Sequence, residues 1–175
     1  MKSGGGKAKG GAFERRIAKA LSQWVSKGQR DDIFWRSSMS GGRATVAKKS
    51  GKLLSASCGD LSAIDPLGKP FLDKYYVEIK HVKSYKLDQF LVKNTGKMAK
   101  AWAICVKEAK AYSKQPLLIA NLGRLGIVIV VEPAYFSYRS QAPVRTKYIY
   151  CSNPEVVVSN FEELLQELVF DVAFA

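Results

Sequence analysis

Apolar residues recur along this chain with two different spacings, and each spacing predicts one type of element. A helical spacing of three to four residues runs through residues 13–24 and again through residues 98–112. Continuous apolar runs of strand length occupy residues 116–120 and 126–131. Helices therefore alternate with strands along the chain, which is typical of the α/β class.

Two other segments alternate polar and apolar residues, as half-buried strands do. Residues 56–64 contain Asp60, and residues 75–81 contain Glu78 and Lys80. The residues between the two segments have turn chemistry, which predicts an antiparallel hairpin with a long connection. If these strands pair, two carboxylates and one ammonium group converge at one place.

The remaining segments predict one domain over residues 13–175, with a C-terminal extension from about residue 132. Residues 1–12 are rich in glycine and lysine, and we expect a flexible basic arm there. The smaller predicted elements are a strand at 33–36, a polar Ser/Gly loop at 37–43, a mobile segment at 43–55, a strand at 148–150, and a last helix that Asn160 opens, with Glu163 placed as in a capping box.

The net charge of +13 is extreme for 175 residues and is unevenly distributed. Lys and Arg outnumber Asp and Glu by thirteen to three in residues 1–52 and by fifteen to seven in residues 53–152, whereas residues 153–175 hold five acids and no Lys or Arg. Clustered basic residues favour DNA or another nucleic acid as the partner, because neutralised phosphates release counterions. An anionic membrane is the competing partner.

Other patterns narrow the class of protein. No segment has the length of a bilayer-spanning helix, and no secretory signal is visible, so we expect a soluble, cytoplasmic protein without a membrane partner. The three cysteines are far apart and odd in number, which argues against a disulfide framework and against a zinc motif. We interpret them as reduced structural thiols.

Asp60, Glu78 and Lys80 are residue types suited to metal-assisted chemistry at a phosphate. Mg²⁺ binds a few oxygen ligands and keeps several waters, so two carboxylates and the carbonyl of Ile79 are an adequate set. The ion polarises a phosphate and acidifies a bound water, while Lys80 adds positive charge where the phosphoryl oxygens become more negative. His81, the only histidine, falls on the opposite strand face from Lys80, which favours a structural role.

A set of motif residues follows in order along the chain: Phe13-Glu14-Arg15, Arg36 with the Ser37–Gly42 loop, Gly59-Asp60 and Glu78-Ile79-Lys80. In this order they resemble the PD-(D/E)XK nuclease superfamily, and most closely its archaeal Holliday-junction-resolvase-like branch and related phage endonucleases. The resemblance covers about residues 12–131. One departure is that Cys58-Gly59 stands where the proline of the motif is expected. The resemblance implies a restriction-endonuclease-like αβββαβ core, with a mixed central sheet flanked by helices.

The resemblance also implies an activity, a cofactor and roles for individual residues. It implies a metal-dependent endodeoxyribonuclease of a prokaryotic cell or a phage-infected host, and it raises the expectation of a homodimer. Branched DNA such as a Holliday junction is one candidate substrate, and the preferred DNA structure stays open. Asp60, Glu78 and the Ile79 carbonyl are then ligands of Mg²⁺, with Mn²⁺ as a substitute, while Lys80 assists the attacking water and Glu14 supports metal or water. The expected DNA-binding residues are Arg15, Arg36, Ser38, Ser40, Arg43, Lys48 and Lys49, with Ser40 the nearest candidate for a phosphate-facing serine.

Two alternatives stay open on the sequence. In the first, the chain is a non-catalytic nucleic-acid-binding protein in which Glu78 and Lys80 form a surface pair. In the second, it is an interaction protein whose acidic segment 160–174 docks onto a partner. Trp24 and Trp102 lie on the apolar stripes of the two long helices, which indicates packing rather than base stacking.

Overall fold

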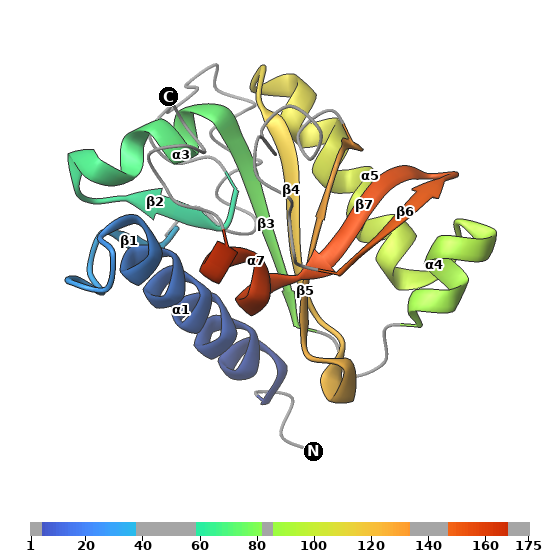
Figure 1. Cartoon of the computed structure of the whole chain (residues 1–175), viewed down its shortest axis with the longest axis horizontal. Coiled ribbons are helices and arrows are strands. Elements are labelled where there is room, and N and C mark those ends of the chain that lie inside the picture. The colour runs from blue at the N-terminus through green and yellow to red at the C-terminus, as the bar shows by residue number, and fades with distance from the viewer. Residues whose placement is uncertain (1–4, 38–58, 82–85, 134–146, 168–175) are drawn as a thin grey trace.

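The computed structural model describes residues 5–37, 59–81, 86–133 and 147–167, and its centre is a five-stranded sheet with helices on both sides (Figure 1). The helices are α1 (Gly5–Val25), α3 (Lys69–Lys74), α4 (Leu87–Lys93), α5 (Gly96–Ala111) and α7 (Phe161–Glu167), with short 3₁₀ helices η1 (Pro66–Gly68) and η2 (Gly123–Leu125). The strands are β1 (Phe34–Arg36), β2 (Leu61–Ala63), β3 (Tyr75–His81), β4 (Gln115–Asn121), β5 (Ile127–Val131), β6 (Tyr148–Ser152) and β7 (Glu155–Asn160).

The large sheet is mixed, and its strands lie in the order β3-β4-β5-β7-β6. β3 and β4 run parallel, which requires a crossover, and α5 lies in the connection between them. The other neighbours in the sheet are antiparallel. Together, α1, β1, β2, β3, α5 and β4 give the predicted order of one helix, three strands, one helix and one strand. The α/β class and the restriction-endonuclease-like fold are therefore confirmed.

Helices cover both faces of the sheet, which explains why the central strands are apolar without alternation. On one face, Ile17 of α1 and Phe161 of α7 pack in the same cluster as Ile119 of β4. On the other face, Trp102 of α5 packs in a second cluster that contains Leu118. Leu118 and Ile119 are consecutive residues of one strand, so their side chains lie on opposite faces and bind the sheet to both helical layers.

The antiparallel hairpin predicted for residues 56–64 and 75–81 is wrong. β2 pairs with β1 in a separate two-stranded antiparallel sheet, and a single parallel bridge between Gly59 and Val77 links this region to β3. The expected turn instead starts a helical connection, because Asp65 Oδ1 accepts a hydrogen bond from the Leu67 N–H at 2.9 Å at the start of η1, and α3 follows. Residues 56–58 of the predicted strand lie outside the described residues.

Both ends of the chain contribute more structure than the pattern predicts. α1 begins at Gly5, so residues 5–12, which we expected in a flexible arm, are its first turns. The low helix propensity of glycine hides this start, although the amphipathic part of the helix begins only at Phe13. Near the other end, β7 lies between β5 and β6, so the expected extension supplies two strands of the central sheet.

The last helix begins where Asn160 predicts. Its Oδ1 accepts hydrogen bonds from the N–H groups of Glu162 and Glu163, each at 3.0 Å. The packing roles of the tryptophans are confirmed as well, since Trp102 is buried and Trp24 meets Phe71 edge-on. Within the described part of the chain, no helix combines the length and apolar character that crossing a bilayer requires.

Because Gly59 packs closely on β3, replacing it should destabilise the fold more than replacing Gly28, which has the same backbone conformation. Gly59 and Gly28 both have a φ of +84°. A Cβ atom on Gly59 would lie 2.2 Å from the Val77 carbonyl oxygen, whereas one on Gly28 would meet nothing within 4 Å. In denaturant titrations we expect Gly28→Ala to cost about 1 kcal/mol and Gly59→Ala at least about 3 kcal/mol. Equal losses would contradict the close packing of Gly59 on β3.

Candidate functional site

Asp60 is attached to the edge of β3 by two hydrogen bonds. Its backbone N–H donates to the Val77 carbonyl at 2.9 Å, and its side-chain Oδ2 accepts from the Ile79 N–H at 2.8 Å. The Asp60 carbonyl also accepts from the Ser37 N–H at 2.9 Å, just after β1 ends. Asp60 thus lies between the end of β1 and the middle of β3, at the level of Glu78.

Glu78 and Lys80 extend from the same face of β3, as residues two apart in a strand must. They form an ion pair between Lys80 Nζ and Glu78 Oε1. Glu78 is buried with 8% of its surface exposed, while about a third of the Lys80 side chain reaches solvent. The structure therefore brings Asp60, Glu78 and Lys80 together, although not through the hairpin that we expected.

Glu14 of α1 lies near these residues and is paired with a cation. Its Oε2 accepts a hydrogen bond from Nε of Arg36, the last residue of β1. A Cβ atom on Gly11 would lie 3.5 Å from a guanidinium nitrogen of Arg36 and 3.6 Å from one of Arg15. Two expected DNA-binding arginines therefore lie side by side over the first part of α1.

The electrostatics of the site centre on Asp60. Burial, followed by the negative charge of Glu78, raises the pKa of Asp60 to about 7. Lys80 and the Ile79 N–H act in the opposite direction, and Glu14 adds a small further increase. The carboxylate of Asp60 is thus destabilised by its surroundings, and an additional cation beside it would relieve this repulsion.

A divalent metal fits this set of residues. In the residues that the structure describes, no three His, Cys, Asp or Glu side chains are grouped to hold a metal ion. Mg²⁺, however, is commonly bound through one or two carboxylates, with waters and substrate phosphates completing its shell. Asp60 and Glu78 supply two carboxylates whose mutual repulsion a dication would offset.

Several predicted site residues cannot be placed next to these groups. Ser38, Ser40, Arg43, Lys48 and Lys49 all lie outside the described residues. Their assignment to a DNA-binding loop stays a prediction.

Sequence reasoning missed a polar pair at the end of β3. Asn121, the last residue of β4, lies opposite His81, with 3.1 Å between Asn121 Nδ2 and His81 Nδ1. The ring of Phe13 packs against that of His81, with 5.1 Å between the two ring centroids. No local signal identifies the pair, because it depends on the register of two parallel strands forty residues apart.

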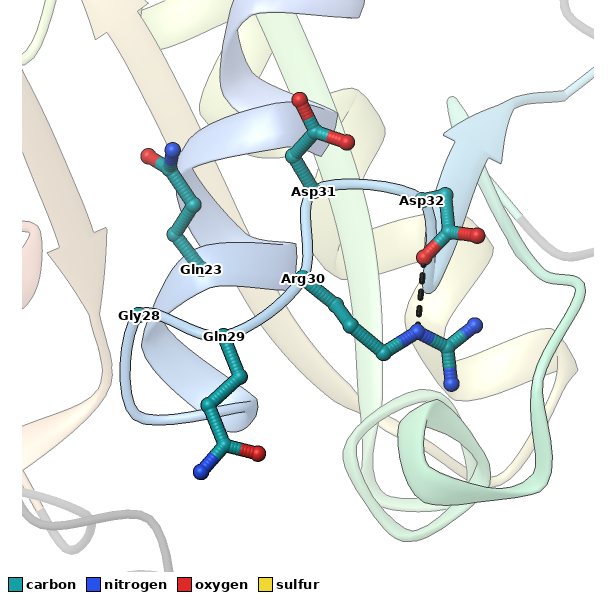
Figure 2. A pocket seen from close by; sticks show the side chains of 6 residues that line it. All are labelled: Gln23, Gly28, Gln29, Arg30, Asp31 and Asp32. Carbon is teal, nitrogen blue, oxygen red and sulfur yellow. Dashed lines mark hydrogen bonds and ion pairs between the residues drawn. The ribbon is translucent and has the colours of Figure 1, made fainter.

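A polar depression at the other end of α1 is separate from this site. Gln23, Gly28, Gln29, Arg30, Asp31 and Asp32 line it (Figure 2). Its charged residues are all ion-paired, since Arg30 pairs with Asp32 at 2.8 Å and with the neighbouring Asp65 at 2.6 Å, and Asp31 pairs with Lys19 at 2.6 Å. None of the predicted catalytic residues borders it, and we assign it no ligand.

Comparison with known proteins identifies a family. The chain matches the family model described as "Phage putative PDDEXK endonuclease" over residues 5–171. No curated protein and no solved structure matches the chain.

The environment of Asp60 predicts how its replacement changes stability with pH. Its pKa rises from 3.8 to about 7 on folding, so ionised Asp60 destabilises the folded state, by an amount that grows above pH 4 and is complete above pH 7. Asp60→Asn removes this charge and keeps an acceptor for the Ile79 N–H. We expect the free energy of unfolding to increase by about 2 kcal/mol at pH 8 and to change little at pH 4.

Asp65→Asn is the matched control, with the opposite sign. Hydrogen bonds from the Leu67 N–H and from Arg30 lower the pKa of Asp65, so its charge stabilises the folded state above pH 4. Thermal unfolding across this pH range should show Asp65→Asn less stable than the wild type at pH 8. A gain for Asp60→Asn that does not depend on pH would contradict the electrostatic explanation.

Proposed function

The chain belongs to the phage PDDEXK endonuclease family, and from this membership we propose that it hydrolyses DNA phosphodiester bonds with a divalent metal held by Asp60 and Glu78 beside Lys80. The observation that carries the proposal is the meeting of a buried, destabilised Asp60 with Glu78 and its ion-paired lysine. Mg²⁺ is the expected ion, with Mn²⁺ as a substitute, because the available ligands are hard oxygen atoms.

Two carboxylates and a backbone carbonyl would hold the ion. Asp60 and Glu78 contribute the charge, and the carbonyl of Ile79, between Glu78 and Lys80 in the sequence, is the expected main-chain ligand. A bound ion would supply a Lewis acid for the phosphate and acidify a coordinated water. The Ile79 N–H holds Asp60 Oδ2, so the carboxylate keeps its position before any ion binds.

Lys80 contributes a positive charge close to the reacting phosphate. Its ion pair with Glu78 favours the ammonium form, which donates hydrogen bonds and does not accept a proton. As negative charge increases on the phosphoryl oxygens, an ammonium group already in place stabilises the transition state more than the ground state.

Glu14 and the arginines serve DNA binding in this proposal. The resemblance assigns Glu14 to the metal or the water, whereas its carboxylate is hydrogen-bonded to Arg36. We assign Glu14 the role of holding Arg36 beside Arg15, so that both guanidinium groups face an approaching phosphate backbone. A planar guanidinium group can donate two parallel hydrogen bonds to one phosphate group, which makes arginine well suited to binding the DNA backbone.

Cleavage assays test the proposal directly. The full chain should nick or cut DNA in the presence of Mg²⁺ or Mn²⁺ and should lose this activity in EDTA. Salt-sensitive DNA binding without cleavage under every divalent metal would instead support the non-catalytic binding protein.

Replacing Glu78 should separate catalysis from folding. We expect Glu78→Gln to lower the cleavage rate by about 100-fold or more, because it removes one of two ligand charges. Glu155→Gln, at an exposed position on β7, is the matched control and should cleave at the wild-type rate. Undiminished cleavage by Glu78→Gln, with its folding verified by circular dichroism, would exclude this site.

The DNA structure that is cut and the assembly of the enzyme belong to the same proposal. The resemblance favours branched DNA and a homodimer, since a four-way junction presents two symmetric strands. A panel of duplex, single-stranded and junction substrates tests the first, and a mass measurement in solution at moderate salt tests the second.

A further inference from the structure

The end of β3 carries a hydrogen-bonded pair that the proposed chemistry does not use. His81 and Asn121 are partners in the register of β3 and β4, and their side chains meet at 3.1 Å between Asn121 Nδ2 and His81 Nδ1. His81 directly follows Lys80, and it contacts Phe13, which directly precedes Glu14. The pair therefore lies at the border of the candidate site.

The hydrogen bonds of Asn121 determine which imidazole nitrogen carries the proton. The backbone N–H of Gly123 donates to Asn121 Oδ1 at 2.7 Å. Because a backbone N–H can only donate, this interaction identifies the amide oxygen, and the amide nitrogen must face His81. An amide nitrogen also only donates, so His81 Nδ1 accepts, and in the neutral ring the proton lies on Nε2.

The position of the ring makes this Nε2–H a fixed donor at the surface. Asn121 holds one nitrogen, and Phe13 packs against the ring with an interplanar angle of 38°. His81 itself is exposed. Among the described parts of the chain, no hydrogen bond to Nε2 is formed.

We propose that His81, oriented by Asn121, donates a hydrogen bond from Nε2–H to a phosphate oxygen of the DNA strand bound at the candidate site. This inference rests on the proposed function, because it requires DNA at the end of β3. Side-chain donors to phosphate oxygens fix the register of a protein on DNA without reading its sequence. Lys80 and His81 extend from opposite faces of β3, so the phosphate that His81 contacts is a different one from the scissile phosphate beside Lys80.

Asn121 is a positioning residue in this arrangement, since it acts on DNA only through the histidine. It selects the tautomer that presents a hydrogen on Nε2. The opposite tautomer would turn a lone pair toward a negatively charged phosphate oxygen, which repels it.

¹⁵N NMR of the imidazole tests both the tautomer of His81 and its contact with phosphate. The signals need no assignment, because His81 is the only histidine of the chain. The full chain without a histidine tag, labelled with ¹⁵N-histidine, should show an unprotonated Nδ1 and a protonated Nε2. Adding duplex DNA without divalent metal should shift the Nε2–H resonance more than that of Nδ1. A proton on Nδ1 in the free protein, or an unchanged Nε2–H in the DNA-bound protein, overturns the inference.

Substitutions provide a second, independent measurement. The amide nitrogen of glutamine can occupy the place of Nε2, whereas asparagine reaches only the place of Nδ1. We expect His81→Asn to weaken DNA binding about tenfold, as loss of one hydrogen bond to a charged group does, and His81→Gln to weaken it clearly less. Equal affinity for His81→Asn and the wild type overturns the inference, as does equal loss in both variants.

Asn121→Ala tests the positioning role separately. We expect a mixture of tautomers in the nitrogen spectrum and a loss of DNA affinity smaller than that of His81→Asn. A wild-type tautomer in Asn121→Ala would show that Asn121 does not select it.

These outcomes can be distinguished from failure of the proposed function. The binding measurements use no divalent metal, so they do not depend on cleavage. Cleavage with an unresponsive His81 refutes only the phosphate contact, whereas a responsive His81 without cleavage under any metal refutes only the nuclease. Absence of both DNA binding and cleavage refutes both.

Discussion

The attachment of Asp60 to the free edge of β3 is the interaction on which the rest of the site depends. Residues 59–60 take the place that a neighbouring strand would take, with one backbone hydrogen bond and one side-chain hydrogen bond to β3. This is feasible only because residue 59 has no Cβ where the chain meets the Val77 carbonyl. From Asp60 the constraint continues through the Ser37 N–H to the end of β1, and through Arg36 to Glu14 on α1. One tight backbone approach thus arranges three elements around β3.

The site is assembled at a cost to the stability of the fold. Asp60 and Glu78 are both buried to 8% exposure, and burial together with the charge of Glu78 disfavours the charged form of Asp60. Lys80 and one backbone N–H compensate this only in part. Groups whose pKa values are shifted by burial and by a like charge are typical of functional sites, because such a shift serves no purpose in packing. The imbalance in charge is what a bound cation would correct.

The sequence predicts the parts of this structure that depend on local periodicity. The two long helices, the buried strands β4 and β5 and the cap at Asn160 follow from spacing and side-chain chemistry alone. The hairpin prediction failed because the residues around Asp65 can end a strand or begin a helix equally well, and only the packing of α3 decides between them. The start of α1 shows a similar limit, since its glycine-rich first turns carry no apolar stripe.

Within the site, the motif residues were predictable, whereas their mutual arrangement was not. Asp60, Glu78 and Lys80 can be recognised from residue type and order, yet β2, the strand that directly follows Asp60, pairs with β1 and not with β3. The contact between Glu14 and Arg36 joins residues twenty-two positions apart, and the pairing of His81 with Asn121 requires the register of parallel strands. Such contacts have no signature in a single sequence.

The position of β7 has a consequence for how the molecule is made. Every residue of the proposed catalytic set precedes β4, but β5 receives its second neighbour only when β7 joins the sheet. During synthesis, the proposed catalytic residues therefore leave the ribosome well before β7, the strand that completes the sheet. Until residue 160 has emerged, the apolar strand Ile127–Val131 of the nascent chain has one unpaired edge, which favours association with other chains. The nascent chain should therefore depend most strongly on chaperones during that interval.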